Sequence, residues 1–410
     1  MWDKIMKIYK KISWSLFGNI IYALSQWGMI TILARFGTKE ELGIYSLGLA
    51  ITAPIVIFFS FELRTLLATE SKNEMNFGQY FGSRVVHLII SYFTIVLIAI
   101  IYSNDSKVIA AILLIGMIKV FEALSDICMG LFQKKQRIDI IGKSQLYKGL
   151  LSIITFSAIY IPTKSLVISL IGLLLVMIIR LFTFDLKNLK KYVETFLIFD
   201  NSSIKLMKYA LPLGIASLIS SLITNVPKYL LEYQIGIEAV GIFSALYYIL
   251  VACNMLITPI SLLAAPRIAN TLDNKDNVNF IKENIIFSLF SVIAFLIIFI
   301  PVYLYSEWVI TFLYGEEYIL YSQVFVIITL SLLFGFLNAF YSLSTIAARI
   351  IKIQPIFKFF LSLITIISSY YFINEFGIMG AAYALILTRS IETLFYIIIL
   401  VYIANKKFHK

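Results

Sequence analysis

The sequence predicts an all-α integral membrane protein with about twelve transmembrane helices. Of its 410 residues, 60% are apolar and only 14% are charged, whereas soluble domains carry charge on about a quarter of their residues. The mean hydropathy is +0.91, and apolar stretches alternate with short polar gaps along nearly the whole chain. A hydrocarbon core about 30 Å thick takes roughly 20 helical residues. Twelve passes with their turns therefore leave no room for a soluble catalytic domain.

Each apolar stretch is expected to be a helix, because lipid offers no partners to the backbone polar groups of an isolated strand and the stretches lack the alternation of a barrel. The first stretch exceeds the apolar region of a signal peptide in length, and eleven more follow it, which excludes a removable signal. The predicted spans are 13–35, 42–67, 81–102, 107–132, 138–161, 165–187, 205–231, 238–265, 279–305, 318–347, 353–373 and 377–403.

The net charge of +11 is distributed unevenly between the gaps. Lysine and arginine gather before the first span, after the fourth, around residues 187–208 and at the C-terminal end, whereas the gaps after spans seven, nine and eleven carry only acids such as Glu238, Glu316 and Glu375. This asymmetry predicts that both termini face the cytoplasm. Contact with anionic membrane lipids explains the basic balance better than a nucleic-acid partner does.

The few histidine and cysteine residues exclude several classes of site. Cys128 and Cys253 lie in separate spans without the spacing of a metal site or redox pair, and the two histidines are His87 and His409. Neither a histidine-based metal centre nor a Ser/His triad can be assembled from them. We therefore expect no cofactor, no metal ion and no enzymatic activity.

The longest interior polar stretch predicts two lobes, residues 1–200 and 201–410, with six spans each. Residues 37–46 between the first two spans recur, one residue shorter, as residues 236–244 between spans seven and eight. Six spans per copy would relate the lobes by an axis along the membrane normal, with a cleft between them, as in parallel-repeat transporters. The alternative is a hairpin turn that recurs without duplication, because glycine ends one helix and an acid starts the next.

Five charged residues fall near the middle of predicted spans: Lys119, Glu122, Lys148, Arg389 and Glu392. At roughly 2.5–3.5 kcal/mol each, they would cost on the order of 15 kcal/mol if they faced lipid. They are therefore expected to face a cavity or one another.

The spacing of these residues allows two interpretations. Lys119 and Glu122 are three residues apart on one helical face, and Arg389 and Glu392 repeat that spacing, which is compatible with internal ion pairs. Lys148 has no acid at pairing distance in its own span, so the first lobe holds a surplus cation at mid-depth, which favours an anionic ligand such as a lipid diphosphate. We predict that Lys119, Lys148 and Arg389 bind the diphosphate. Glu122 and Glu392 are the candidates for coupling to a proton or cation.

Charges nearer the span ends are interpreted more simply. Arg64 is a candidate for meeting the anionic headgroup at the entrance, with snorkelling to the surface as the alternative, and Lys228 is a candidate for receiving the anion on its outward path. The other charges at span ends are expected to snorkel to headgroups. These are Arg35, Asp126, Arg180, Asp185, Arg267 and Arg349.

Four segments, in this order, resemble the Wzx-type bacterial polysaccharide flippases, the exporters of O-antigen and capsule repeat units within the multidrug/oligosaccharidyl-lipid/polysaccharide exporter superfamily. Residues 225–249 resemble the hairpin between the seventh and eighth spans of that family. Residues 122–133 with Lys148 and Gly149 are similar to its fourth and fifth spans, where an arginine is frequent at the position of Lys148. Residues 313–322 and 376–382 resemble its hairpins before the tenth and twelfth spans.

The resemblance implies two six-helix bundles around a central V-shaped cavity. It also implies an undecaprenyl-diphosphate-linked oligosaccharide as substrate, moved from the inner to the outer leaflet of the bacterial cytoplasmic membrane by alternating access and driven by an ion gradient. Polysaccharide polymerase and glycosyltransferases are the implied partners. Lipid II flippases of the same superfamily usually have fourteen spans and an arginine in the first span. Here the first span has no charge before Arg35, so the anion site of the first lobe depends on Lys119, Lys148 and Arg64.

Two other functions remain open at this point. A multidrug or solute antiporter of the same superfamily usually has an acid-lined pocket for cations, and the mid-span lysines favour the flippase over it. A membrane polysaccharide polymerase typically has a large external loop with catalytic Arg, His or Asp residues. The longest external gap here is only about a dozen residues.

Overall fold

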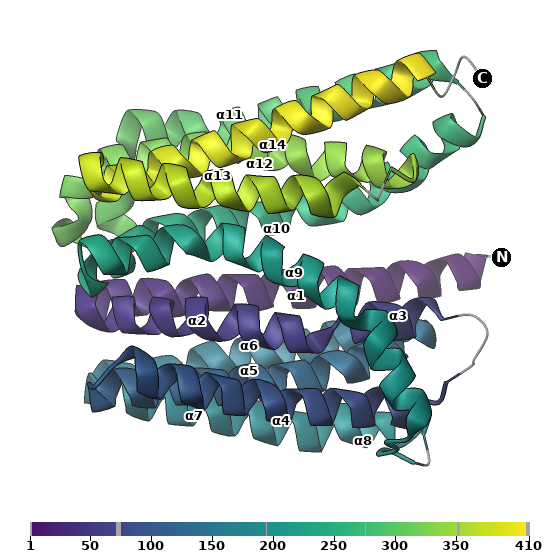
Figure 1. The fold of residues 1–410 in the computed structure, drawn as a ribbon, viewed down its shortest axis with the longest axis horizontal. Helices are drawn as coiled ribbons and strands as arrows, with labels where there is room; N and C mark the ends of the chain where they lie inside the picture. Colours follow the sequence, from purple (N-terminus) through teal and green to yellow (C-terminus); the bar gives the residue numbers. More distant parts are fainter. Residues whose placement is uncertain (1, 71–74, 194, 275, 351–352, 407–410) are drawn as a thin grey trace. The chain divides into compact units, whose positions relative to one another are not determined.

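The computed structural model describes residues 2–70, 75–193, 195–274, 276–350 and 353–406. The chain is 91% helical, and no strand occurs among the described residues. Twelve segments of that part of the chain are long and apolar enough to cross a membrane. The predicted fold class, an all-α protein with about twelve transmembrane helices, is confirmed (Figure 1).

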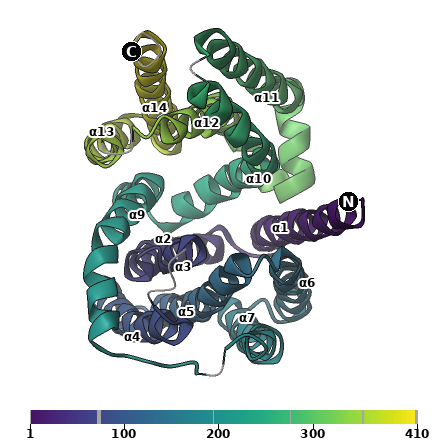
Figure 2. The same cartoon turned by 90° about the vertical axis from the view of Figure 1, so that its right-hand side faces the viewer.

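The chain divides into two compact units, Met1–Leu222 and Ile223–Lys410. The helices that lie in the first unit are α1 (Trp2–Phe36), α2 (Lys39–Ser60), α3 (Leu63–Thr69), α4 (Phe77–Tyr102), α5 (Ser106–Lys134), α6 (Ile138–Thr163), α7 (Leu166–Arg180), η1 (Leu181–Asp185) and α8 (Leu186–Leu189). Within this unit α5 is central, because α2, α3, α4 and α7 all pack against it, while α1 packs along α6 (Figure 2).

Helix α9 (Asn201–Gln234) contains the boundary between the two units. The helices that follow it in the second unit are α10 (Ile237–Asp273), α11 (Asn277–Tyr314), η2 (Glu316–Tyr321), α12 (Ser322–Ala347), α13 (Ile353–Phe376) and α14 (Ile378–Lys406). Here α12 is central and contacts α10, α11 and α14. The assignment of two functional lobes at 1–200 and 201–410 stays a prediction.

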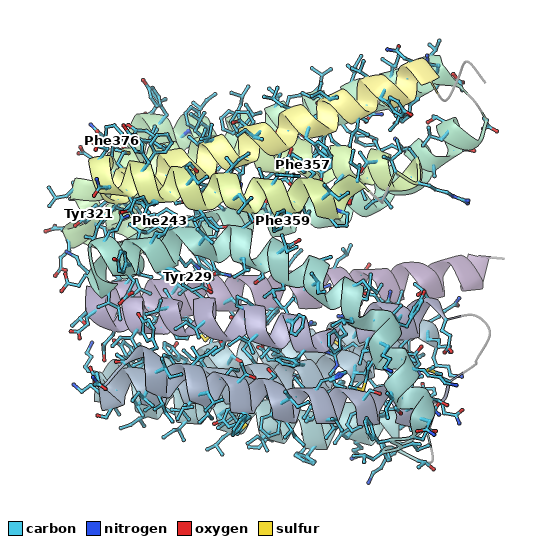
Figure 3. All side chains as sticks on the ribbon, in the orientation of Figure 1. Tyr229, Phe243, Tyr321, Phe357, Phe359 and Phe376 are labelled. Carbon is cyan, nitrogen blue, oxygen red and sulfur yellow. The ribbon has the colours of Figure 1, made fainter. Side chains whose placement is uncertain are left out.

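Large apolar side chains cover the outside of both units, as the stick view shows (Figure 3). Ile101, Val278 and Leu320 are each more than three quarters exposed. Phe359 and Phe376 of α13, both labelled in Figure 3, are about half exposed. Such exposure is costly in water and ordinary in lipid. For the basic residues at the ends of the chain, within residues 1–12 and 406–410, the structure does not describe the side chains.

Glycines allow α1 and α6 to approach backbone to backbone. A Cβ atom on Gly18 would lie 2.0 Å from the carbonyl oxygen of Gly142, and one on Gly142 would lie 2.2 Å from the carbonyl oxygen of Trp14. Small residues permit this kind of close helix packing in membranes. One turn further along, the Cα of Tyr22 lies next to Gly149, which sets the side chain of Tyr22 beside α6.

We expect Gly142→Ala to lower the stability of the protein by about 1–3 kcal/mol, because the added methyl group meets rigid backbone and must push α1 away from α6. The measurement is thermal unfolding of the purified protein in detergent. Gly28→Ala is the matched control, since its Cβ would meet only the flexible tip of Ile153, at 3.0 Å. Equal melting temperatures of the two variants would contradict the close packing.

The predicted span 42–67 is a broken helix. Phe61 and Glu62 adopt left-handed conformations with φ of 46° and 51°, and they separate α2 from α3. Such angles are strained for residues with a Cβ. Phe61 is buried and contacts the ring of His87 edge to face, at 4.5 Å between centroids. The break redirects the chain at the point where Arg64 begins its contact with α5.

A second irregularity lies at the end of α7. Residues Leu181–Asp185 form a single π-helical turn, closed by a hydrogen bond from the Leu186 amide to the Leu181 carbonyl. Residues five apart share a face in this geometry, and such bulges are frequent at functional sites. The bulge therefore brings Arg180 and Asp185 onto the same side of the helix.

Helix α11 continues beyond the predicted end of its span at residue 305. Tyr305 departs from helical geometry with φ of −130° and ψ of 32°, four residues after Pro301. The missing amide hydrogen of Pro301 leaves the carbonyl of Ile297 without its helical partner, while the interruption itself falls at Tyr305, after which the helix resumes to Tyr314.

Candidate functional site

The mid-span lysines of the first unit share a single carboxylate. The Nζ atom of Lys119 lies 2.8 Å from Oε2 of Glu122, and the Nζ atom of Lys148 lies 2.9 Å from Oε1. Lys119 and Glu122 lie on α5, as their spacing predicts, while Lys148 reaches across from α6. Two ammonium groups and one carboxylate leave one surplus positive charge. We call these three residues the lysine bridge.

Tyr22 of α1 completes the surroundings of the lysine bridge. Its hydroxyl donates a hydrogen bond of 3.4 Å to Oε1 of Glu122, and the Nζ atom of Lys148 lies 3.9 Å from the centre of its ring. A cation over a tyrosine face is attracted by the ring electrons. Three helices thus converge on one carboxylate, and Lys119 and Glu122 keep 21% and 14% of their side-chain surface exposed.

A small cavity adjoins the lysine bridge, lined in part by Gln26, Tyr45 and Ser152. Its volume is about 20 Å³, which is enough for one water molecule. A diphosphate does not fit there. An anion of that size must approach the bridge from its exposed side or after the helices have moved.

A second charged cluster lies one helical turn from the lysine bridge. Asp126 accepts a hydrogen bond of 2.7 Å from Nη1 of Arg64, and Nη2 of Arg84 lies 3.8 Å from the other oxygen of Asp126. Arg84 of α4 is 1% exposed, and its Nε and Nη1 atoms have no hydrogen-bond partner in the described part of the chain. Glu62 is a second acid that interacts electrostatically with Arg84, so two arginines and two acids gather here. The expectation that Asp126 snorkels to the headgroups does not account for these ion pairs, which hold the carboxylate although its side chain is 38% exposed.

The third cluster is closed and electrically neutral. Arg180 and Asp185 are 2% and 0% exposed and form an ion pair of 3.0 Å. Ser125 of α5 and Ser144 of α6 each donate a hydrogen bond of 2.7 Å to Asp185 and accept one from Nη1 of Arg180. The expectation that Arg180 and Asp185 snorkel is therefore wrong. The two serines lie one turn from Glu122 and Lys148 on the same two helices.

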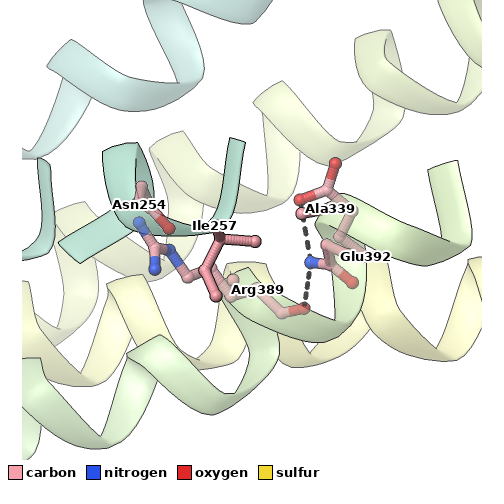
Figure 4. Close-up of a pocket in the computed structure, with 7 residues that line it drawn as sticks. Asn254, Ile257, Ala339, Arg389 and Glu392 are labelled. Atoms are coloured by element: carbon pink, nitrogen blue, oxygen red, sulfur yellow. Dashed lines mark hydrogen bonds between the residues drawn. The ribbon is translucent and has the colours of Figure 1, made fainter. Parts of the chain in front are cut away.

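The charged residues of α14 lie in the second unit, around a pocket of about 290 Å³. Arg389 and Glu392 do not pair, and Arg389 has no carboxylate at ion-pair distance among the described residues. Figure 4 shows the guanidinium group on the side of Asn254 and the carboxylate on the side of Ala339. The internal ion pair that the spacing allows does not form.

Lys228 of α9 is a buried cation without a described carboxylate partner. It is 5% exposed, and its Nζ atom lies 5.6 Å and 5.8 Å from the ring centres of Tyr247 and Tyr248 on α10. Glu232, four residues along the same helix, forms no ion pair with it in the described structure. Aromatic faces replace a counter-ion here.

Most of the first unit and part of the second match a known protein family. Residues 8–272 match the sequence model of the family described as polysaccharide biosynthesis protein. The chain belongs to this family. It is 26% identical over 394 residues to the capsular polysaccharide biosynthesis protein CapF of Staphylococcus aureus, covering 94% of this chain and 98% of CapF.

Solved structures show that this member of the family has the fold of known transporters. The lipid II flippase MurJ in an inward closed conformation matches with a TM-score of 0.76 and 17% identity, over 96% of this chain and 87% of that one. An inward-facing multidrug resistance transporter of the MATE family matches with a TM-score of 0.75 and 12% identity, over 95% and 96% of the two chains. At these identities the likeness shows the fold.

The structure brings some of the predicted site residues together and separates others. Lys119, Glu122 and Lys148 meet directly, and Arg64 lies in the neighbouring cluster. The remaining three, Lys228, Arg389 and Glu392, belong to the second unit. Arg389 and Glu392 line one pocket there, and Lys228 is not among the residues that line it.

Sequence reasoning missed Arg84 and Tyr22. Arg84 lies a few residues inside the third span, where snorkelling explains a charge without a partner, and Tyr22 is one of 25 tyrosines. The glycines at positions 18, 142 and 149 are the signal that would have placed α1, and hence Tyr22, against α6.

Proposed function

We propose that this protein is a flippase that moves undecaprenyl-diphosphate-linked oligosaccharide from the inner to the outer leaflet of the bacterial cytoplasmic membrane. The observation that carries the proposal is the lysine bridge, in which two lysines share one carboxylate at mid-span and leave a positive charge for an anion. Membership of the polysaccharide biosynthesis family, the likeness to CapF and the MurJ-like fold support a lipid-linked glycan as the cargo.

The lysine bridge suggests how the substrate is bound. Glu122 neutralises part of the charge of Lys119 and Lys148 while no substrate is present. A diphosphate offers several oxygen atoms to the same two ammonium groups and competes with the carboxylate. Glu122, once displaced, is available to take up a proton or a cation, which would couple binding to an ion gradient.

The other cationic residues are proposed to act before and after this step. The arginines of the Arg64, Arg84 and Asp126 cluster would meet the diphosphate first, because the cluster lies nearer the end of its spans that carries most lysines and arginines. Lys228 would receive it in the second unit. That end faces the cytoplasm by the positive-inside rule, as do both termini. Polymerase and glycosyltransferases would act on the glycan, and this chain itself would make no bond.

The test of the function is removal of the protein from cells that make the glycan. Surface glycan should disappear while undecaprenyl-linked repeat units accumulate in the membrane, and the wild-type gene should restore both. If instead surface glycan stays normal and the cells become more sensitive to drugs, the protein is a multidrug antiporter. If glycan units are exported but their chains do not lengthen, the result favours the hypothesis that the protein is a polysaccharide polymerase.

We expect that Glu122→Gln makes the rate of glycan export independent of the ion gradient. Wild-type transport should fall when the proton gradient or the sodium gradient is collapsed, whereas the variant should respond to neither, because an amide cannot bind a proton or a cation as a carboxylate does. The measurement is export of newly made glycan with and without ionophores. If the variant loses export on collapse of the gradient to the same extent as the wild type, Glu122 is a structural partner of the two lysines.

A further inference from the structure

The pocket that holds Arg389 and Glu392 lies between α10, α12 and α14 of the second unit (Figure 4). It is lined by a positively charged hydrogen-bond donor, Arg389, and a negatively charged acceptor, Glu392. Arg389 and Glu392 are spaced for an ion pair on one helix, yet each contacts other groups. Binding of a diphosphate does not explain why the two side chains stay apart. The pocket therefore calls for a different kind of ligand.

Asn338 of α12 holds the carboxylate away from the guanidinium group. Its side-chain amide donates hydrogen bonds to Oε2 of Glu392 at 3.2 Å and to the carbonyl of Arg389 at 3.3 Å. The hydroxyl of Thr393 donates to the amide oxygen of Asn338 at 2.8 Å, which fixes the orientation of the amide. No hydrogen bond to the second oxygen of Glu392 occurs in the described structure, and Lys358 of α13 also interacts electrostatically with this carboxylate.

Gly335 provides the space in which the guanidinium group lies. A Cβ atom at this position would come within 2.6 Å of Nη1 of Arg389 and 3.6 Å of the side-chain oxygen of Asn254. Nη1 donates to the carbonyl of Ser331 at 3.2 Å, which leaves most of the five N–H donors of the guanidinium group for a ligand.

The charges of the pocket select the ligand class. Glu392 would repel a diphosphate, and Arg389 would repel a simple cation. A charged ligand of either sign would therefore be attracted by one of the two groups and repelled by the other. Sugar hydroxyls both donate and accept hydrogen bonds. The volume of about 290 Å³ lies at the lower limit of small-molecule sites, which suits a group of monosaccharide size.

We propose that this pocket binds an uncharged sugar residue of the transported glycan, with Arg389 donating to its oxygens and Glu392 accepting from its hydroxyls. The proposal rests on the flippase function and gives the two residues a role different from the diphosphate binding and ion coupling that their mid-span positions predict. The lysine bridge would bind the diphosphate, and this pocket would recognise the sugar.

The experiment measures ligand-induced stabilisation of the purified full-length protein, because a ligand that binds the folded state raises the melting temperature. The probes are inorganic diphosphate and a panel of free uncharged hexoses and N-acetylhexosamines. At least one sugar should stabilise the wild type. Arg389→Ala should weaken the binding of that sugar about 10- to 100-fold, since hydrogen bonds to a charged group are lost, and should keep the response to diphosphate.

Gly335→Ala provides a second variant that keeps every charge. The added methyl group displaces only the flexible end of Arg389, so the sugar response should fall in a protein that remains folded. Glu392→Gln should also weaken the sugar response, because it removes the charged acceptor. Glu375→Gln, which changes an exposed acid of the same unit, is its control and should leave the sugar response unchanged.

The outcomes separate the two proposals. No stabilisation by any sugar of the panel, or loss of the diphosphate response in Arg389→Ala with the sugar response intact, would overturn the sugar site. Stabilisation by a sugar that depends on Arg389, without any response to diphosphate, would support the sugar site and contradict the lysine bridge as the diphosphate site.

Discussion

Replacing Lys148 with alanine is expected to reduce surface glycan at least about tenfold while the protein remains in the membrane. The substitution leaves Lys119 and Glu122 as a neutral pair, so the surplus positive charge that attracts the diphosphate is lost. A hydrogen bond to a charged group contributes about 1.5–3 kcal/mol, which corresponds to a loss of about 10- to 100-fold in binding. The measurement is quantification of surface glycan alongside the amount of protein in isolated membranes.

Two further variants make the result specific. Lys107→Ala removes an exposed lysine from the same helix as Lys119 and should leave surface glycan unchanged. Lys148→Arg keeps the charge and should retain much of the transport, in agreement with the arginine that is frequent at this position in Wzx-type flippases. If Lys148→Ala and Lys119→Ala both export glycan normally, the lysine bridge does not bind the substrate.

The second large effect concerns stability. Asp185→Ala should destabilise the first unit by about 3–5 kcal/mol, because it leaves the guanidinium group of Arg180 buried without its carboxylate. Ser125 and Ser144 would each lose the acceptor of their hydrogen bond as well. The measurement is the fraction of protein that remains monodisperse in detergent after heating. A variant as stable as the wild type would show that this network does not hold α5, α6 and α7 together.

The double variant Arg180→Met with Asp185→Leu distinguishes loss of a charge partner from loss of packing. Replacement of a whole buried ion pair by apolar residues is often neutral or stabilising, whereas removal of one partner is not. The double variant should therefore recover much of the stability lost in Asp185→Ala. Its failure to recover would indicate that the serine hydrogen bonds, rather than the ion pair, stabilise the cluster.

The fold was predictable because a membrane leaves few choices to the backbone. Helices are required wherever about twenty apolar residues follow one another, so the helical segments in the structure agree with the predicted spans to within several residues in most cases. The exceptions are local. Two irregularities were not predicted: the break at Phe61 and Glu62, and the π-helical turn after Arg180. The residues at both places are as apolar as those of a continuous helix, so the hydropathy of the sequence does not reveal them.

The candidate site was predictable only in part. Spacing along α5 placed Lys119 next to Glu122, because the helical repeat alone decides that contact. The partner of Lys148 comes from another helix, and so do both cations of Asp126. Pairing across helices depends on packing, which here is set by glycines and serines whose contacts a sequence does not display.

Translocation by the purified protein tests the central claim most directly. Proteoliposomes that contain the wild type or the Lys119→Ala/Lys148→Ala variant would be loaded with fluorescent undecaprenyl-diphosphate-linked oligosaccharide, and its arrival in the outer leaflet would be followed by a quencher that does not cross the membrane. The wild type should move the lipid in the presence of an ion gradient, and the variant should move it no faster than empty liposomes. Equal rates for the wild type and the variant would contradict the proposed role of the lysine bridge in transport.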